Sequence, residues 1–274
     1  MRLLALDLDD TLLRSDLTIS HRNKNAIKKA EAAGVTVVLA SGRVPAAMER
    51  YIRFLGMHQK PGYIICNNGA LIQESHAGNV IYETNITAEV ALFAYKLADA
   101  EGFAVQIYEK DTMYVSRNNE FTSYDQKLTG LRQVVVKDFR TMIQNGCHKL
   151  LIPGDPMLLA PLQNLFHNFL GDEVTLFTSK PYFLEILPVG TDKGTALAKI
   201  ADFLGIKQEE TLAIGDSMND EAMIRWAGVG VAMVNGDERI KKIADLVSEK
   251  TNDDDGVAGI IEQYILSKSD VYHG

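Results

Sequence analysis

The chain has 274 residues, of which 46% are hydrophobic and 23% are charged, and its formal net charge is −8 at pH 7. This composition is typical of a globular protein with an adequate core, and the negative charge disfavours nonspecific binding to nucleic acid or to anionic membranes. No apolar run reaches about 18 residues, no signal peptide is expected, and two distant cysteines, Cys66 and Cys147, favour a cytoplasmic protein without membrane spans.

The first predicted element is a buried strand at residues 2–6, and three carboxylates follow it directly: Asp7, Asp9 and Asp10. Like charges gathered after a buried strand repel one another unless a cation compensates them. Asp7 and Asp9 lie two residues apart and therefore point the same way along an extended chain, which suits the oxygen ligands of Mg²⁺. Taken alone, the same stretch is explained more simply as a solvated turn.

A repeating strand–helix pattern follows the opening strand. Ser20 is placed to cap a helix over 21–33, and a β-branched run over 35–40 predicts a second strand. A helix over 45–55 and a strand over 62–66 come next. This order predicts parallel strands with right-handed connections. The second and third strands both end in polar residues, Ser41-Gly42-Arg43 and Asn67-Asn68-Gly69.

The pattern changes after residue 71. A hairpin near 71–82, amphipathic helices over 87–101 and 156–170, and several short strands indicate an α+β module with an open, mostly antiparallel sheet. Residues 119–130 are polar and aromatic, and they fit no single element. Nothing in this part of the sequence gathers catalytic residue types densely.

The strand–helix pattern returns with a helix over 192–204 and a strand over 212–214, which ends in the polar stretch 215–220. Shorter helices and strands continue it, with helices at 219–227, 236–244 and 256–267 and strands at 230–233 and 246–247. We therefore predict an α/β fold in which residues 1–82 and 188–274 form a Rossmann-like parallel-sheet core. Residues 83–187 are expected to be an inserted α+β domain, which a surface loop tolerates when the ends of the insert lie close together.

Three polar clusters follow directly on predicted parallel strands, at 7–11, 41–43 and 216–220. Open parallel sheets bind ligands outside the carboxyl ends of their strands, so we expect these clusters to meet at one edge. Lys193 adds a cation in the first turn of a helix, where the helix dipole disfavours it. A solvated lysine accounts for that residue alone, whereas an anionic ligand beside it would account for its position.

The motifs Asp-x-Asp-x-Thr, Ser-Gly-Arg, the distant Lys193 and Gly-Asp-x-x-Asn-Asp, in this order, resemble the four motifs of the haloacid dehalogenase superfamily of phosphatases. An insert between the second and third motifs is similar to the type C2 cap arrangement. Further stretches resemble the Cof-type subfamily, at Leu12-Leu13, 67–70, 182–186 and 255–258. The similarity extends over nearly the whole chain. It implies a Rossmann-like core whose C2 cap closes over the substrate and provides specificity.

The resemblance implies a Mg²⁺-dependent phosphomonoesterase with three catalytic residues. Asp7 would attack phosphorus, Asp9 would act as general acid and then as general base, and Lys193 would neutralise charge on the phosphoryl group. The implied metal ligands are Asp7, Asp9 through its backbone carbonyl, Asp216 and Asp220. The implied phosphate-binding or substrate-binding residues are Leu8, Ser41, Gly42, Arg43, Asn68, Lys193 and Asn219.

Several of these residues have plainer explanations. Arg43 is explained almost as well as a surface arginine at a strand end, and Asn68 belongs to an Asn-Asn-Gly turn signal. Asp220 either binds the metal or holds a metal-bound water or Lys193. The acidic run at 252–255 lacks the full Ca²⁺-loop pattern, and capping of the last helix explains it.

The expected substrate is a small phosphorylated metabolite, with sugar phosphates favoured by the resemblance and nucleic acid disfavoured by the net charge. A monomer or weak homo-oligomer is expected. Two other functions stay open, a phosphotransferase or phosphomutase that uses the same intermediate, and a non-enzymatic phospho-ligand sensor. Asp9 argues against the sensor, because an internal acid–base group shortens the life of the phosphorylated state that a switch needs.

Overall fold

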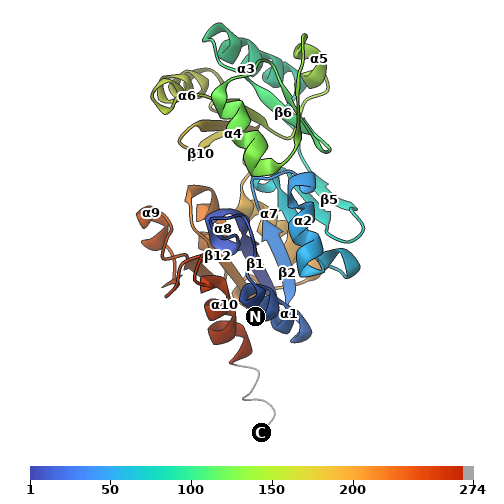
Figure 1. Ribbon diagram of the computed structural model, residues 1–274, viewed down its shortest axis with the longest axis vertical. Helices are drawn as coiled ribbons and strands as arrows, with labels where there is room; N and C mark the ends of the chain where they lie inside the picture. Colours follow the sequence, from blue (N-terminus) through green and yellow to red (C-terminus); the bar gives the residue numbers. More distant parts are fainter. Residues whose placement is uncertain (268–274) are drawn as a thin grey trace. The chain divides into compact units, whose positions relative to one another are not determined.

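The computed structural model describes residues 1–267, and the chain divides into two compact units (Figure 1). The expected insert, 83–187, lies within the second unit, which also includes a short segment that follows the second strand. The first unit comprises Met1–Ser41, Arg50–Ile81 and the chain from Asp192 onward, and the second comprises Gly42–Glu49 and Tyr82–Thr191.

The first unit is built on an eight-stranded sheet whose central strand is β1 (Leu3–Asp7). It runs parallel to β2 (Thr36–Ala40) on one side and to β12 (Thr211–Gly215) on the other, with Leu4 opposite both Val37 and Leu212. All of β1 is buried, as a strand in the middle of a parallel sheet must be. The strand order is β14-β13-β12-β1-β2-β3-β4-β5, completed by β3 (Tyr63–Cys66), β4 (Leu71–Glu74), β5 (Val80–Glu83), β13 (Val229–Ala232) and β14 (Leu246–Val247).

The position of β12 decides where a ligand can bind. The chain adds β2 on one side of β1 and, much later, β12 on the other, so the strand order reverses between these two neighbours. Such a reversal leaves a crevice at the carboxyl ends of the two strands, because the connections leave in opposite directions. Residues that follow β1 and β12 therefore converge at this edge of the sheet.

Helices cover this sheet (Figure 1), and their ends obey the local signals of the sequence. The Ser20 hydroxyl accepts a hydrogen bond from the Asn23 amide at 3.0 Å, as predicted for an N-cap. The carboxylate of Asp192 does the same for Thr195 at 2.7 Å. The helices are α1 (His21–Ala32), α2 (Pro45–Leu55), α7 (Lys193–Leu204), α8 (Glu221–Trp226), α9 (Glu238–Lys241) and α10 (Gly256–Ile261). Helix α1 packs against α10, and the first residues of α2, up to Glu49, are grouped with the second unit.

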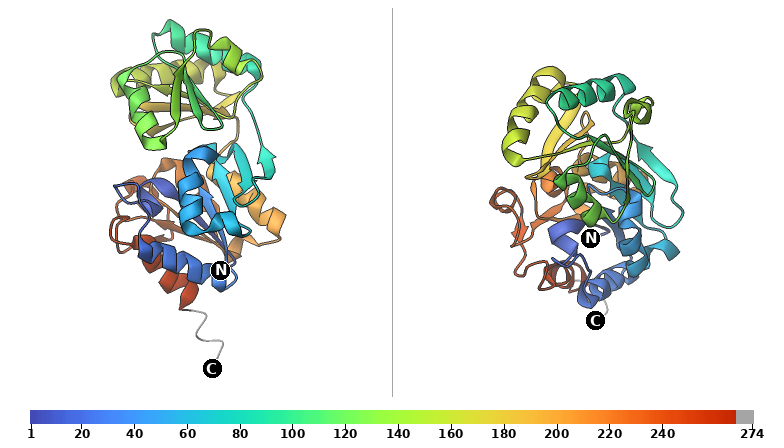
Figure 2. Two further views of the ribbon diagram at one scale, coloured as in Figure 1. Left: turned by 45° about the vertical axis from the view of Figure 1, so that its right-hand side comes forward. Right: turned by 45° about the horizontal axis from the view of Figure 1, so that its top comes forward.

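The second unit is an α+β module with a six-stranded sheet in the order β10-β11-β9-β6-β7-β8 (Figure 2). Its neighbours are antiparallel except β7 and β8, which are parallel. The strands are β6 (Gln106–Glu109), β7 (Thr112–Val115), β8 (Arg132–Val135), β9 (Leu150–Pro153), β10 (Val174–Lys180) and β11 (Phe183–Pro188). Helices α3 (Ala88–Ala100), α5 (Arg140–Ile143) and α6 (Pro156–Leu170) pack around buried Phe139 and Phe166.

The predicted fold class, a Rossmann-like core with an inserted α+β domain, is confirmed. Residues 119–130, for which no element was expected, form α4 (Glu120–Thr129). Its start is fixed by a capping box in which Asn119 and Thr122 exchange side-chain and backbone hydrogen bonds, and its end by left-handed Gly130. The helix expected over 236–244 is only Glu238–Lys241, although Ile243 and Ala244 beyond its end pack against the same small apolar cluster as Ile240.

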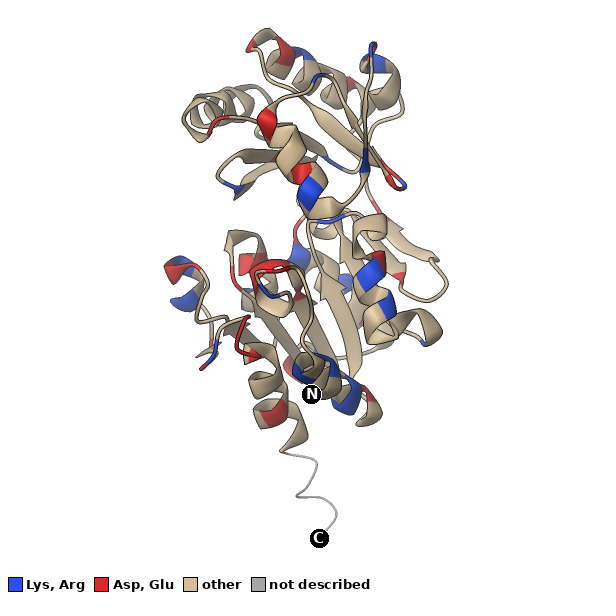
Figure 3. Ribbon diagram, viewed as in Figure 1, with Lys and Arg blue, Asp and Glu red and all other residues tan. Residues whose placement is uncertain are grey.

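Charged residues of both signs share the helices of the first unit (Figure 3). On α9, for example, Lys241 pairs with Glu238 at 2.8 Å, and Arg239 pairs with Asp237 just before the helix at 2.5 Å. Within residues 1–267, no helix combines the length and the apolar character that a membrane span requires.

Candidate active site

Three carboxylates meet at the reversal point of the sheet. Asp7 is the last residue of β1, Asp216 directly follows β12, and Asp220 ends the helical turn after it. One oxygen from each lies within 4.8 Å of the others, and all three residues are buried. The expectation that the clusters at 7–11 and 216–220 converge is therefore confirmed by the geometry.

Lys193 lies against this cluster and is fully buried. Its Nζ donates hydrogen bonds to Asp7 Oδ1 and to Asp220 Oδ1, each at 2.6 Å. These two carboxylates offset the unfavourable field at the start of α7, which a lysine otherwise avoids. Lys193 is thus a member of the site, and its interpretation as a solvated lysine is wrong.

Asp220 organises the loop that follows β12. Its second oxygen, Oδ2, accepts the backbone amides of Asp216 and Ser217 at 3.0 and 3.1 Å. Asp216 in turn accepts a hydrogen bond from the Thr11 hydroxyl at 2.9 Å. Both oxygens of Asp220 therefore have partners within the protein, and this residue holds Lys193 and the loop in place.

Burial and crowding dominate the electrostatics of the cluster. Burial raises the pKa of Asp7 to about 7, with repulsion from Asp220 adding to the increase and Lys193 opposing it. Burial also raises the pKa of Asp216 to about 9, and the charges of Asp7 and Asp220 add to it. Burial alone would lower the pKa of Lys193, but Asp220 and Asp7 hold it above its usual value. Three carboxylates lie near a single ammonium, so a further cation would reduce the repulsion among the carboxylates.

The donor set fits a hard divalent cation. The clustered ligand atoms are all carboxylate oxygens, which is the chemistry that Mg²⁺ and similar ions prefer. The side chain of Asp9 is not part of this group of three. Any role of Asp9 toward a metal therefore rests on its backbone carbonyl.

The chain leaves the sheet after Asp7, where strand β1 ends. Asp9 keeps an extended backbone, with φ −71° and ψ 126°, and Asp10 has a left-handed φ of 62°. That Asp7 and Asp9 point the same way stays a prediction. Asp9 is half-buried and Asp10 is exposed, and the Asp10 carbonyl accepts a hydrogen bond from the Asn235 amide at 2.8 Å.

Hydrogen bonds connect Ser41 to the loop after β12 through Asn68. The Asn68 amide donates to the Ser41 carbonyl at 3.0 Å, and the Asn219 side chain donates to Asn68 Oδ1 at 3.1 Å. The Ser217 hydroxyl then donates to Asn219 at 2.7 Å. Sequence reasoning identified Ser41, Asn68 and Asn219 separately, and the structure joins them in one chain of hydrogen bonds.

The turn that carries Asn68 packs against the start of α7. Asn67, Asn68 and Gly69 all have positive φ, which the Asn-Asn-Gly sequence tolerates. A Cβ at Gly69 would lie 2.3 Å from the Asp192 carbonyl oxygen, just before Lys193. Glycine is therefore required both by conformation and by the close approach, a role that the turn signal alone does not reveal.

The next two residues of the Ser-Gly-Arg motif, Gly42 and Arg43, belong to the second unit. Arg43 is buried, and its Nη1 donates to the Leu128 carbonyl in the last turn of α4 at 2.8 Å. Its interpretation as a surface arginine is therefore wrong. A cation at the carboxyl end of a helix also interacts favourably with the helix dipole.

The acidic run at 252–255 has another role than the one expected. Asp255 precedes α10, but its side chain makes no capping hydrogen bond and instead pairs with Arg14 at 3.2 Å. Asn252 donates to the Leu13 carbonyl at 2.9 Å, and Asp253 accepts from the Ser15 amide at 2.9 Å. The run fastens the loop after the Leu8–Leu12 turn.

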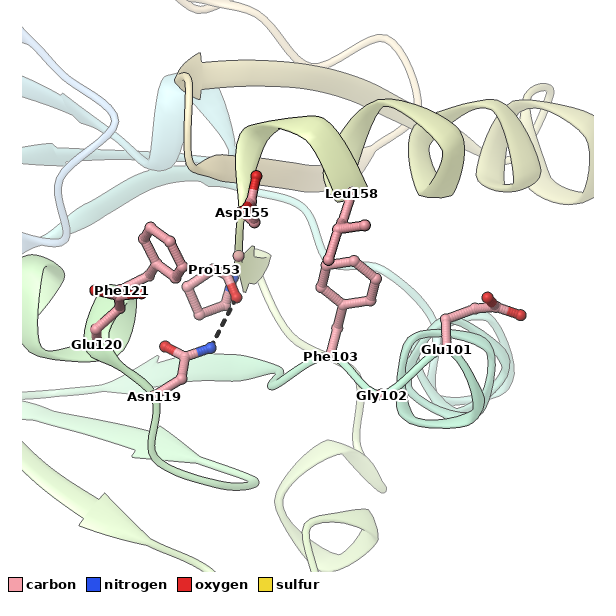
Figure 4. Close-up of a pocket in the computed structure, with 10 residues that line it drawn as sticks. Glu101, Gly102, Phe103, Asn119, Glu120, Phe121, Pro153, Asp155 and Leu158 are labelled. Carbon is pink, nitrogen blue, oxygen red and sulfur yellow. Dashed lines mark hydrogen bonds between the residues drawn. The ribbon is translucent and has the colours of Figure 1, made fainter.

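A separate cavity of about 330 Å³ lies within the second unit (Figure 4). Phe103 and Phe121 line it together with Asn119 and Asp155. Asn119 donates to the Pro153 carbonyl at 3.0 Å, and Asp155 accepts the Met157 amide at 2.8 Å at the start of α6. Because these polar groups already stabilise the local backbone, we assign the cavity no catalytic role.

The sequence as a whole matches the family of haloacid dehalogenase-like hydrolases over residues 4–261. A buried carboxylate at the end of β1, a buried lysine and an acidic loop after β12 accompany that match. The chain belongs to this family, and it is a phosphatase.

Similar proteins cover nearly the whole chain. It is 31% identical over 274 residues to a protein of Bacillus subtilis (strain 168) described as a phosphatase and called YxeH, covering 97% of this chain and 99% of that protein. The 5-amino-6-(5-phospho-D-ribitylamino)uracil phosphatase YwtE of the same strain is 31% identical over 287 residues, covering 97% and 98%. A crystal structure of a haloacid dehalogenase-like hydrolase from Bacteroides thetaiotaomicron matches with a TM-score of 0.89 and 34% identity, covering 96% and 98%.

Proposed function

We propose that this phosphatase hydrolyses a phosphomonoester of a small metabolite through an aspartyl-phosphate intermediate, with Mg²⁺ as its cofactor. The observation that carries the proposal is the buried Lys193 ammonium, 2.6 Å from both Asp7 and Asp220, with Asp216 in the same cluster. Asp7 is the nucleophile of this proposal because it stands at the carboxyl end of the central strand and is held by a cation.

Asp7, Asp216 and the backbone carbonyl of Asp9 would hold the metal ion. Asp220, whose oxygens bond Lys193 and two amides, would contribute through a bound water. When bound, Mg²⁺ would neutralise part of the charge on the phosphoryl oxygens, so that a carboxylate can approach an anionic phosphate.

The reaction has two displacements at phosphorus. The Asp7 carboxylate attacks phosphorus, the bond from phosphorus to the ester oxygen breaks, and Asp9 gives a proton to the leaving alkoxide. Asp9 then takes a proton from water, and the resulting hydroxide attacks the phosphorus of the aspartyl-phosphate. Phosphate leaves and Asp7 is regenerated. Lys193 stabilises the negative charge that the phosphoryl oxygens carry in both steps.

The remaining predicted residues would bind the phosphoryl group. The Ser41 hydroxyl and the Gly42 amide are donors for its oxygens, and Leu8 lies in the turn directly after the nucleophile. Asn68 and Asn219, already bonded to each other, would orient these donors or the metal shell. Arg43 has one donor on the Leu128 carbonyl, and we propose a substrate contact for another part of its guanidinium.

The substrate class we propose is a small phosphorylated metabolite, with sugar or sugar-alcohol phosphates first. The relative YwtE is described as acting on a phosphoribityl compound, which carries its phosphate on a polyol chain. The net charge of −8 disfavours nucleic-acid substrates. The second unit would act as a cap that provides specificity and excludes water.

The proposal is tested with p-nitrophenyl phosphate as a generic substrate. Hydrolysis should stop after treatment with EDTA and return when Mg²⁺ is added, because Lys193 alone cannot balance the negative charges of both the carboxylate cluster and the phosphate. Rapid acid quenching of the wild-type protein during turnover should trap a phosphate on Asp7, which mass spectrometry of the digested protein locates. Activity that persists in EDTA would contradict the metal site.

The same assay separates the other functions. Release of inorganic phosphate with water as the only acceptor supports a hydrolase, whereas transfer to an added alcohol or sugar without phosphate release would indicate a phosphotransferase or mutase. A phosphoenzyme of the intact protein that survives for hours would instead indicate a phospho-ligand sensor.

A further inference from the structure

The boundary between the two units falls at the Ser41–Gly42 peptide, which carries the amide proposed to bind phosphate. Ser41 belongs to the first unit, where its amide donates to the Ile65 carbonyl at 2.9 Å and its carbonyl accepts from Asn68 at 3.0 Å. Gly42 belongs to the second unit, where its carbonyl accepts a hydrogen bond from Lys149 Nζ at 2.8 Å. The carbonyls on both sides of the Gly42 amide therefore have fixed partners.

Lys149 is 5% exposed, and it lies just before β9. Its Nζ is 3.3 Å from Glu185 Oε2 and 5.0 Å from the centre of the Tyr108 ring. Glu185 is equally buried in the middle of β11, paired with Leu151 of β9. Burial of a charge pair destabilises the folded state unless the remaining hydrogen-bonding groups of the pair also have partners. Here one further donor of Lys149 bonds the Gly42 carbonyl.

The rest of the same segment is fixed within the second unit as well. Arg43 donates to the Leu128 carbonyl, and two apolar residues of the segment join a small buried cluster. That cluster consists of Val44, Ala47, Met113, Val115 and Leu131. The segment after Gly42 therefore cannot shift without breaking several interactions at once.

The geometry of the peptide shows why Lys149 matters for phosphate. The Ser41 carbonyl and the Gly42 amide lie in one planar group, and the hydrogen bond from Asn68 restrains one edge of that plane. A rotation of the plane changes φ of Gly42, which glycine tolerates easily, so the plane is held only if the next peptide is held as well. Lys149 holds the next peptide at the Gly42 carbonyl and thereby opposes a rotation of the Gly42 N–H.

We propose that Lys149, held by Glu185, is a positioning residue of the phosphate site, which acts through the Gly42 backbone. This inference rests on the proposed function, because it takes the Gly42 amide as a phosphate donor. Lys149 then influences the affinity for the phosphoryl group through the direction of the Gly42 N–H.

The test is the double variant Lys149→Met/Glu185→Leu, which replaces both buried charges together and so leaves neither unpaired. We expect kcat/KM for p-nitrophenyl phosphate to fall roughly 10- to 100-fold, the range seen when a catalytic donor is slightly misplaced. The dissociation constant of inorganic phosphate, measured by calorimetry in saturating Mg²⁺, should rise about tenfold, and the Mg²⁺ concentration for half-maximal activity should not change. Lys149→Arg should recover part of the loss, since a guanidinium can still donate to the Gly42 carbonyl.

Asp125→Asn is the matched control. Asp125 is a buried carboxylate of the same unit that accepts hydrogen bonds from Tyr108 at 2.7 Å and from Gln106 at 2.6 Å. Asp125→Asn should alter the unfolding temperature and leave the phosphate affinity unchanged. If Lys149 had only a structural role, the Lys149 variants would behave in the same way.

A folded double variant with wild-type phosphate affinity overturns the proposal. If that variant does not fold, Lys149→Met/Glu185→Gln removes the donor to Gly42 and leaves a neutral amide in place of the carboxylate, and unchanged phosphate affinity of that variant overturns the proposal equally. Failure of the proposed function gives a different result: the wild-type protein binds phosphate but hydrolyses no phosphomonoester, and the phosphate affinities of the variants still decide the role of Lys149.

Discussion

Lys193 of the first unit and Lys149 of the second are both buried ammonium groups, yet their surroundings differ in charge. Lys193 contacts two carboxylates at 2.6 Å, and a third belongs to the same cluster. Lys149 has one carboxylate at 3.3 Å, a backbone carbonyl at 2.8 Å and an aromatic ring. The first group keeps an excess of negative charge, whereas in the second a single carboxylate contacts the ammonium and Asp125 lies farther away, behind Tyr108.

The difference separates two uses of a buried charge. A cluster with excess charge is unstable by itself and gains stability from an added cation and a charged substrate, which suits chemistry. Lys149 instead donates to Glu185 and to the Gly42 carbonyl, and such a paired cation can hold a backbone group in a fixed orientation. Variants at the two lysines should therefore fail in different measurements.

The largest effect is expected for Asp7→Asn. It removes the nucleophile and keeps the shape of the residue, so hydrolysis of p-nitrophenyl phosphate should fall by at least about 1,000-fold with the fold intact by circular dichroism. Residual activity above a tenth of the wild-type rate, with contamination excluded, would contradict the nucleophile assignment.

Lys193→Met should cost almost as much activity, about 100- to 1,000-fold, because it removes the cation beside the phosphoryl oxygens. It also leaves Asp7 and Asp220 without their ammonium, so the unfolding temperature without metal should drop, and Mg²⁺ should restore part of it. Lys149→Met should show the opposite pattern, in which Mg²⁺ restores no stability. Equal responses to Mg²⁺ in the two variants would break the comparison.

Gly69→Ala tests how rigidly Lys193 is held. The new Cβ would lie 2.3 Å from the Asp192 carbonyl at a φ of +113°, and we expect unfolding to become easier by about 1–3 kcal/mol. Gly205→Ala is the control, because φ there is +62° and nothing lies within 4 Å, so its cost should stay near about 1 kcal/mol. Urea unfolding measures both, and equal costs would show that the close approach at Gly69 does not matter.

The smallest effect concerns pH and the second unit. Burial raises the pKa of Asp125, against hydrogen bonds from Tyr108 and Gln106 and the charge of Lys149. A carboxyl with a raised pKa in the folded state stabilises most below its unfolded pKa of about 4, and that contribution is lost as pH rises through the folded pKa. The unfolding temperature of the wild type minus that of Asp125→Asn should therefore decrease as pH increases from about 4. A pH-independent difference would contradict this.

Much of the fold could be predicted because its signals are local. Apolar runs gave the strands, and Ser20 and Gly205 marked helix ends that the structure confirms. The convergence of Asp7 and Asp216 followed from a general property of parallel sheets. Helix α4 was missed because its apolar pattern is weak and its capping box uses Thr122 where glutamate or glutamine is the common signal.

The remaining features depend on contacts between distant parts of the chain. The motif resemblance placed Lys193 at the site and offered it as a partner of Asp220, but periodicity and local signals alone do not place it between Asp7 and Asp220, nor do they align Asn68 with Asn219. Alternation along a strand gives no firm position for the Asp9 side chain, because β1 ends at Asp7 and the backbone becomes left-handed at Asp10. The motif Ser-Gly-Arg gave no sign that its second and third residues belong to another unit, since that division follows from packing.

The hydrogen bonds from the run at 252–255 to the loop at Leu13 and Ser15 have a consequence for biosynthesis. They join residues 239 and 238 positions apart, and β12, a neighbour of β1, is also made late. At about 5–20 residues per second, a ribosome needs roughly 10–50 s to make the intervening chain. During that interval the nascent protein holds Asp7 without Lys193, Asp216 or the segment that fastens the catalytic loop. The phosphatase therefore becomes competent only after residues 252–255 have been made.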